Sequence, residues 1–353
     1  DWLMAVPFVL GLVWTVRRWR RPAAMTTLLW VLIMLGPTIL AEDTPHFLRA
    51  AAVLPAVLFL PALGLDWMWR WEAAPRLARR AGVVGLLAGS LLIGWRDYAA
   101  YGRQPEVAYL FETAVTDLAA QINAEPAGVA VFLDGPRYWQ KYPSLPFLVD
   151  AGRVVVYDAA VGLPPLPETA VIYAWPYDGL TAVRQAIQPP ALVSPAWGSL
   201  ARGDLEAEAY PLFARYAIQP PPDWPVQATF GENLALRQVE VQTLPSGELQ
   251  VDVVWEGETA VPATFTAFVH LLGPAGVVAQ SDGPPGAGLW PADWWAEGLL
   301  LRDRRTITLP AGLPEGPLTL EIGWYDAATG MRLMVQNPAG EDLGDTFIWS
   351  GGG

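Results

Sequence analysis

The sequence predicts a multi-domain membrane protein: a four-helix transmembrane segment, then a small α/β domain, then a C-terminal antiparallel β-sandwich. Three observations predict this order. Long apolar stretches fill residues 1–96, helical and strand-like patterns alternate over 97–218, and short strands separated by Gly and Pro turns fill 223–350. Of the 353 residues, 53% are hydrophobic and 16% charged, whereas soluble domains carry about 25% charged residues.

Four apolar stretches define the predicted transmembrane segment, over residues 2–16, 23–41, 50–69 and 81–95. A helix needs about 20 residues to cross the hydrocarbon core, and the second and third stretches reach that length. The fourth is short and rich in glycine, so its pattern also fits a buried helix of a soluble protein, but its flanking residues favour a span. We therefore expect the lipid bilayer to be a partner of this chain.

Two arginine clusters set the expected orientation. They comprise Arg17, Arg18, Arg20 and Arg21 after the first stretch, and Arg70, Arg76, Arg79 and Arg80 after the third. Positively charged loops stay in the cytoplasm, so the short acidic loop at 42–46 and everything after Trp95 should lie outside. The expected localisation is the cell membrane, multi-pass, with the C-terminal body outside the cytoplasm.

The composition excludes several classes of function. Residues 1–96 hold ten of the 22 basic residues and five of the 35 acidic ones, so the remainder carries a formal charge of −18. A body this acidic repels phosphate backbones, and we expect no nucleic-acid partner. The chain has no cysteine and only two histidines, His46 and His270, which predicts no metal site and no cofactor. His270 lies on the outer face of a predicted strand, where we expect a solvent-facing or hydrogen-bonded side chain.

The predicted α/β domain, within 97–218, rests on five patterned segments. Residues 105–122 carry apolar side chains at helical spacing and predict one amphipathic helix, and 177–187 predicts another. Residues 128–133, 153–157 and 170–175 are short apolar runs bounded by Gly, Pro and Asp, as in buried parallel strands. No glycine-rich phosphate loop follows a strand, so a nucleotide site is not supported.

The predicted β-sandwich, over 223–350, begins after the proline-rich boundary at 219–222. Residues 249–255 and 264–272 alternate apolar and polar side chains, as half-buried strands do. Further short strands are predicted towards the C-terminus, with a hairpin turn at 325–330. This spacing indicates a sandwich of two packed sheets.

A cluster of aromatic residues in the second half of the chain offers a candidate carbohydrate contact. It comprises Trp290, Trp294 and Trp295 together with Asp293 and Glu297. Exposed tryptophans beside a carboxylate can stack on a sugar and hydrogen-bond its hydroxyls. Tryptophans in a long loop can equally cover one end of a sandwich, and both interpretations stay open.

The segment at 42–49 offers a candidate site at the outer face of the membrane. Arg49 lies about one turn inside apolar sequence, where an ionisable group is costly unless it is paired or reaches the interface. Arg49 and His46 are candidates to hold a lipid phosphate, since arginine binds phosphate through two parallel hydrogen bonds. Alternatively, Arg49 extends to the headgroups or pairs with Glu42 or Asp43 of the acidic loop, and serves only as an anchor.

The run TPHFLR at 44–49, with AAVLPA at 51–56, resembles the late transmembrane region of GT-C-type membrane glycosyltransferases. The nearest group is glycosyltransferase family 39, the dolichyl-phosphate-mannose–protein mannosyltransferase-like enzymes, in bacterial forms. Residues 268–272, 280–285 and 324–330 resemble the external C-terminal part of these proteins.

This resemblance implies a parent protein that transfers a sugar from a polyprenyl-phosphate donor to an acceptor outside the cytoplasm. In that family the catalytic acidic residues lie in the first external loop; Glu42 and Asp43 lie in a later one, so no catalytic residue is assigned here. The chain is expected to be a fragment that lacks the N-terminal part of the same protein and is inactive alone. A non-enzymatic membrane anchor carrying a carbohydrate-binding or adhesion module is the alternative. A sandwich that only packs on the membrane part or on a partner subunit is a third possibility.

Overall fold

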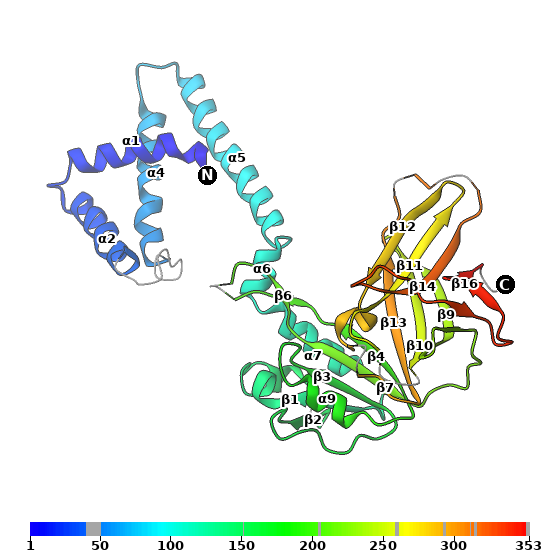
Figure 1. Ribbon diagram of the computed structural model, residues 1–353. Helices are drawn as coiled ribbons and strands as arrows, with labels where there is room; N and C mark the ends of the chain where they lie inside the picture. The colour runs from blue at the N-terminus through cyan, green and yellow to red at the C-terminus, as the bar shows by residue number, and fades with distance from the viewer. Residues whose placement is uncertain are drawn as a thin grey trace. The chain divides into compact units, whose positions relative to one another are not determined.

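The computed structural model divides the chain into two compact units, Asp1–Val107 and Ala108–Gly353, and each is described by itself. The structure describes residues 1–39, 51–150, 152–203, 206–257, 261–291, 294–310, 312–313 and 316–350. Helices form the first unit, and a large mixed sheet with many antiparallel strands forms most of the second (Figure 1).

The first unit contains helices at each of the four predicted apolar stretches. They are η1 (Trp2–Met4), α1 (Ala5–Arg17), α2 (Pro22–Ile39), η2 (Ala51–Val53), α4 (Leu54–Arg70) and α5 (Arg76–Tyr101). Two of the helical segments, Ala51–Arg70 and Arg76–Tyr101, are long and apolar enough to cross a membrane by length and composition. The helical segments Trp2–Arg17 and Pro22–Gly36 are apolar but shorter. Length and composition therefore support two of the four predicted spans.

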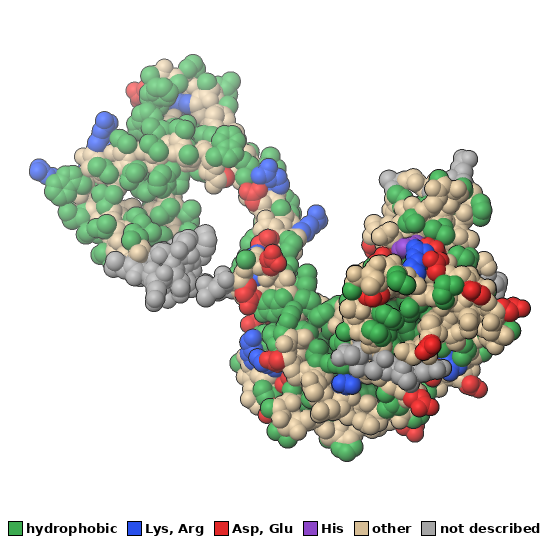
Figure 2. Space-filling view, viewed as in Figure 1, with side chains coloured by type: hydrophobic (Ala, Val, Ile, Leu, Met, Phe, Trp, Pro, Cys, Tyr) green, Lys and Arg blue, Asp and Glu red, His purple; other side chains and the backbone are tan. Residues whose placement is uncertain are grey.

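The apolar side chains of this unit point outward to an unusual degree. On α5, Leu91 is 74% exposed, Leu92 70% and Trp95 72%. Hydrophobic side chains cover most of the visible surface of these helices (Figure 2). Monomeric soluble proteins rarely leave contiguous apolar surface of this extent in water.

Helices α1 and α4 cross closely at two glycines. A Cβ atom added to Gly11 would lie 1.7 Å from the carbonyl oxygen of Leu60, and one added to Gly64 would lie 1.8 Å from that of Pro7. Small residues let two helix backbones approach in this way, and such contacts are typical of helix pairs in membranes. The crossing therefore depends on both glycines.

The second unit is built from seventeen named strands and several short helices among the described residues. The helices are α6 (Pro105–Leu110, which begins before the boundary), α7 (Thr113–Ala124), η3 (Gly135–Trp139), α8 (Leu145–Leu148), α9 (Leu180–Ala186) and η4 (Pro285–Gly288). The first strands are β1 (Ala130–Asp134), β2 (Val154–Tyr157), β3 (Ala170–Ala174), β4 (Ala191–Trp197), β5 (Leu200–Ala201), β6 (Tyr210–Pro211) and β7 (Ala214–Gln219). The later strands are β8 (Ala228–Phe230), β9 (Leu234–Thr243), β10 (Leu249–Gly257), β11 (Phe265–Gly273), β12 (Gly276–Gly283), β13 (Leu299–Ile307), β14 (Thr319–Asp326), β15 (Val335–Gln336), β16 (Asp342–Gly344) and β17 (Phe347–Trp349).

Strands β1, β2 and β3 form a parallel group with helices on both faces. The parallel pairing of β1 with β2 and with β3 confirms that the three apolar runs are parallel strands. The prediction that all three are buried is wrong for β2, where Val155 is 47% and Val156 44% exposed. Helix α7 packs Leu118 and Ile122 against one face of the group. Val183 of α9 joins Phe132 and Ile172 on the opposite face. Covering both faces explains why β1 and β3 read as continuous apolar runs.

The single helix predicted over 105–122 is wrong, because the structure contains two helices there, α6 and α7. Glu112 separates them, with φ 51° and ψ 39°. A residue in this left-handed conformation cannot continue a right-handed helix. The chain therefore turns at Glu112, and α7 starts in a new direction.

One sheet runs through both predicted external domains. Its eleven strands lie in the order β16-β15-β8-β9-β10-β13-β4-β7-β3-β1-β2, and β13 pairs in parallel with β4 through Leu299–Leu301 and Ala191–Val193. A second sheet, β12-β11-β14-β17, contributes to the same core. The rings of Trp255 and Trp324, one from each sheet, lie 5.2 Å apart. The proline-rich segment at 219–222 thus separates β7 from β8 along the chain, while the sheet and the core continue across it.

Candidate functional site

The carboxyl edge of β1, β2 and β3 is the place where this fold offers a ligand site. The strands lie in the order β2-β1-β3, so the chain leaves β1 to one side for β2 and then crosses to the other side for β3. Connections that diverge in this way open a crevice beyond the carboxyl ends of the strands, where open α/β sheets bind their ligands. A ligand site is therefore expected at the loops that follow these three strands.

Acidic residues follow all three strands and line a hollow of about 420 Å³ together with Arg137. Asp134, at the end of β1, is only 2% exposed, and its burial raises the pKa of its carboxyl group. Asp158, after β2, accepts a hydrogen bond from the backbone N–H of Ala160 at 2.9 Å. Asp178, beyond β3, forms an ion pair with Arg137. Among the residues that the structure describes, no group of three His, Cys, Asp or Glu side chains could hold a metal ion.

Trp175 follows β3 directly and lies at the centre of an aromatic cluster on the same edge. Its ring centroid lies 5.3 Å from that of Tyr177, 6.1 Å from that of Tyr210 and 6.3 Å from that of Tyr138. Two cations lie near its ring, with the guanidinium carbon of Arg137 at 5.4 Å and the ammonium nitrogen of Lys141 at 5.5 Å. Cations at this distance are attracted by the ring electrons, so the cluster fixes Arg137 and Lys141 at the edge.

A second hollow, of about 380 Å³, lies between the α6–α7 junction, the loop after η3 and the β5–β6 hairpin. We call it the tyrosine hollow. The polar and aromatic side chains that line it are Tyr109, Glu112, Thr113, Lys141, Tyr142, Arg202, Glu206 and Tyr210. Its two cations each lie near a tyrosine ring, Arg202 at 5.4 Å from Tyr109 and Lys141 at 5.3 Å from Tyr142. Both hollows fall in the lower part of the size range of small-molecule sites.

The carboxylates of the tyrosine hollow raise the pKa of two of its phenols. Burial raises the pKa of Tyr142, and the negative charges of Glu112 and Glu206 raise it further. Burial, followed by the charge of Glu206, raises the pKa of Tyr210 as well. Both phenols therefore remain protonated at neutral pH and can donate a hydrogen bond. Glu206 is itself held by the backbone N–H of Gly203, at 2.8 Å from one carboxylate oxygen.

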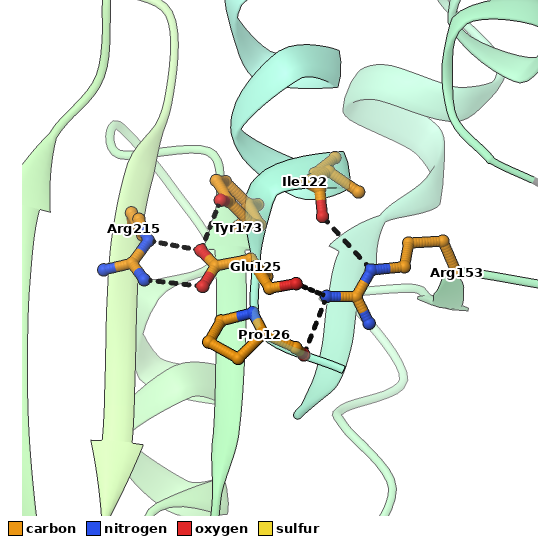
Figure 3. A network of polar contacts seen from close by, with 6 residues as sticks. All are labelled: Ile122, Glu125, Pro126, Arg153, Tyr173 and Arg215. Atoms are coloured by element: carbon orange, nitrogen blue, oxygen red, sulfur yellow. Dashed lines mark hydrogen bonds and ion pairs between the residues drawn. The ribbon is translucent and has the colours of Figure 1, made fainter. Parts of the chain in front are cut away.

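A polar network at the far end of α7 holds that helix on the sheet (Figure 3). The carboxylate of Glu125 accepts hydrogen bonds from Nε and Nη2 of Arg215, at 2.7 and 2.9 Å, and from the hydroxyl of Tyr173 at 2.8 Å. The guanidinium of Arg153 donates to backbone carbonyls at the end of the helix and just beyond it. The Ile122 and Pro126 carbonyls also accept backbone N–H bonds from Glu125 and Val129, so Arg153 gives each of them a second hydrogen bond. These bonds fix the orientation of α7, whose other end borders the tyrosine hollow.

The tryptophans considered as carbohydrate contacts lie largely in the core. Trp290 is 1% exposed and Trp295 3% exposed. Their rings pack against those of Tyr216 and Trp324, at 6.4 and 5.8 Å. A ring enclosed in this way presents no free face to a sugar, whereas Trp294 is half-buried and packs edge-on against Trp290 at 5.5 Å.

Several predicted site residues lie outside the described residues. These are the acidic-loop residues Glu42 and Asp43, the lipid-phosphate candidates His46 and Arg49, and the carbohydrate candidate Asp293. Their assigned roles remain predictions.

The external segments that carry the family resemblance lie together on the smaller sheet. His270 is 8% exposed, and its two ring nitrogens lie 3.0 Å from Asp282 and 3.1 Å from Glu321. The ring of Phe268 lies 4.6 Å from that of His270 and 6.2 Å from that of Tyr325. His270 is therefore a hydrogen-bonded strand residue that joins three strands.

Sequence patterns alone do not single out the residues of the carboxyl edge. The signal that could have found them is an acidic residue at or just after each of the three apolar runs, namely Asp134, Asp158 and Asp178. Its meaning depends on the strand order, which the sequence does not display.

Comparisons with known proteins add little to this picture. The sequence matches no known protein-family profile and no curated protein. Among solved structures, similarity is found to the crystal structure of an endonuclease/exonuclease/phosphatase from Beutenbergia cavernae DSM 12333, at 14% sequence identity and a TM-score of 0.21. That alignment covers 43% of this chain and 35% of the other. A likeness this weak supports no conclusion about fold or function.

Proposed function

We propose that this chain is part of an integral-membrane glycosyltransferase that transfers a sugar from a polyprenyl-phosphate donor to an acceptor outside the cytoplasm. The observation that carries the proposal is the joining of outward-facing apolar helices to a unit with aromatic and ionised hollows at its carboxyl edge. The resemblance at residues 44–49 and in the external segments points to the same class of enzyme. We assign no catalytic residue within the chain.

The proposal includes four membrane spans with the large unit outside the cytoplasm. The outward-facing apolar side chains of α5 support the membrane location. Two arginine clusters, at 17–21 and 70–80, support the orientation, since positively charged loops stay inside. The external unit then meets acceptors on the outer side.

The absence of cysteine from the sequence allows a direct test of this topology. Ala73→Cys lies in the loop between α4 and α5, and Ala275→Cys lies in the turn between β11 and β12. A membrane-impermeant maleimide should label Ala275→Cys in intact cells or spheroplasts and Ala73→Cys only after permeabilisation. Labelling of both variants in intact cells, or of neither, would contradict the proposed orientation.

The transfer reaction is tested in membranes of cells that produce the protein naturally. Vesicles are supplied with a panel of polyprenyl-phosphate-linked radiolabelled sugars, and membranes from a gene-disrupted strain serve as the control. We expect label from one donor to reach an acceptor only when the gene is intact. Equal labelling in both strains, for every donor in the panel, would refute the transferase.

The alternative is a membrane-anchored carbohydrate-binding or adhesion module without enzymatic activity. The tyrosine hollow favours it as much as it favours the transferase, because both need a surface that holds sugars. Glycan binding by intact membranes that show no gene-dependent transfer would select this alternative.

A further inference from the structure

The tyrosine hollow has the chemistry of a subsite for a sugar. We infer that it binds an uncharged sugar ring of the acceptor. The assignment of this ring to the acceptor rests on the proposed function, whereas the binding of the ring rests on the hollow itself.

The position of the hollow marks it as a ligand site. It lies at the carboxyl edge of the parallel strands, because α7 runs antiparallel to β1 and the β5–β6 hairpin precedes β7 at the end of β3. Its volume of about 380 Å³ is enough for a small ligand and too small for a folded partner. Sites in α/β sheets occur at this edge.

The charge balance of the hollow selects an uncharged ligand. Its four ionised side chains are Lys141, Arg202, Glu112 and Glu206, two of each sign. The cations are near aromatic rings, where the ring electrons already attract them. A charged ligand would be attracted by one pair of these side chains and repelled by the other, so the hollow offers no net charge that favours an anion or a cation.

The remaining groups suit a ring with apolar faces and hydroxyl edges. Tyr109, Tyr142 and Tyr210 each combine an aromatic face with a phenol oxygen. The phenols donate and accept hydrogen bonds. The carboxylate of Glu206 is hydrogen-bonded to the Gly203 N–H and to the hydroxyl of Tyr210 and has further acceptor positions left for a ligand. A polyhydroxylated ligand can satisfy both kinds of group at once.

The backbone at Glu112 adds an independent sign of function. A non-glycine residue in the left-handed region is uncommon and costs free energy, and such residues cluster at functional sites. No described residue donates a hydrogen bond to the Glu112 carboxylate. The left-handed turn thus places a carboxylate with free acceptor positions on the rim of the hollow.

The test measures sugar binding by the full chain in nanodiscs, because glucoside and maltoside detergents would compete. Saturation-transfer NMR is recorded with methyl glycosides of neutral hexoses, with glucuronate and with glucosamine. We expect transfer to at least one neutral glycoside and none to the charged sugars. Glu206→Gln and Tyr210→Phe should weaken binding about tenfold, since each removes one strong hydrogen bond. The control Glu240→Gln changes a carboxylate on β9, whose side chain is 53% exposed, and should leave binding unchanged.

Three results would overturn the inference. They are the absence of transfer to every neutral glycoside, equal binding of glucuronate, and unchanged binding in both hollow variants. The variants preserve side-chain size, and their thermal unfolding is compared with wild type to confirm folding. The binding experiment contains no lipid-linked donor, so its outcome is independent of the transfer reaction. Binding of a neutral glycoside without gene-dependent sugar transfer would refute only the proposed function. Gene-dependent sugar transfer without binding of a neutral glycoside would refute only this inference.

Discussion

Replacing Glu125 by alanine tests the structure of the second unit most directly. The substitution removes a carboxylate that accepts three hydrogen bonds of 2.7 to 2.9 Å from Arg215 and Tyr173. The Glu125 side chain is 7% exposed and that of Arg215 27%. Removing one partner of a buried pair costs about 3–5 kcal/mol. Water can reach part of Arg215, so we expect a loss of about 2–4 kcal/mol in the free energy of unfolding.

The assay is thermal unfolding of the full chain in detergent, followed by near-ultraviolet circular dichroism. A loss of this size in a unit of this length lowers the melting temperature by roughly 5–15 °C. The matched control is Glu240→Ala, which removes a carboxylate that lies 3.5 Å from Nη1 of Arg302. This substitution should lower the free energy of unfolding by at most about 0.5 kcal/mol. Equal melting temperatures for the two variants would refute the role assigned to the network in Figure 3.

The same network predicts how this difference changes with pH. Burial alone would raise the pKa of Glu125, but the hydrogen bonds from Arg215 and Tyr173 outweigh burial and lower it below its ordinary value of 4.5. A carboxyl group with a lowered pKa in the folded state contributes stability above its unfolded pKa and loses it as the pH falls through the folded pKa. The gap between wild type and Glu125→Ala should stay constant from pH 6 to 8 and narrow below about pH 4. A gap that widens with acid would contradict this sign.

Two further substitutions test packing elsewhere. Gly11→Ala should destabilise the crossing of α1 and α4 by about 1–3 kcal/mol, because the new methyl group overlaps a backbone carbonyl of α4. The control is Gly85→Ala on α5, where an added Cβ meets nothing within 4 Å. Equal melting temperatures of the two variants would exclude the close crossing. Asp303→Ala should cost about 3–5 kcal/mol, because Asp303 is 1% exposed and its loss leaves Arg305, 6% exposed, without its carboxylate. Denaturant unfolding measures the second loss, and a loss below about 1 kcal/mol would show that the pair is not needed for stability.

Local patterns in the sequence predict the strands and their faces well. Residues 249–255 alternate, and the structure places Val251, Val253 and Trp255 in the core, as predicted. This succeeds because alternate side chains of a strand point to opposite faces whatever the rest of the fold does. The apolar runs at 128–133 and 170–175 succeed for a different reason, because side chains on both faces of β1 and β3 are buried.

Features that depend on residues far apart in the chain could not be predicted from local sequence patterns. The pairing of Leu299–Leu301 with Ala191–Val193 joins segments more than 100 residues apart, and nothing local distinguishes this partner from others. The burial of Trp290 and Trp295 could not be predicted for a related reason, since tryptophans in a loop can point towards solvent or into the core. The sequence also does not predict the left-handed turn at Glu112, because glycine, the residue that usually marks such turns, is absent there.

The continuous sheet gives the C-terminal half of the chain a part in the candidate site. The β5–β6 hairpin, which carries Arg202 and Glu206 in its loop, connects β4 to β7. Strand β4 precedes the hairpin and β7 follows it, and the two pair over Leu192–Trp197, while β13 pairs with the first residues of β4 at Ala191–Val193. The sheet therefore anchors both ends of the segment that carries the hairpin, although no residue of β13 lines the hollow. The antiparallel strands then serve to position the hollow, whether or not they touch a ligand themselves.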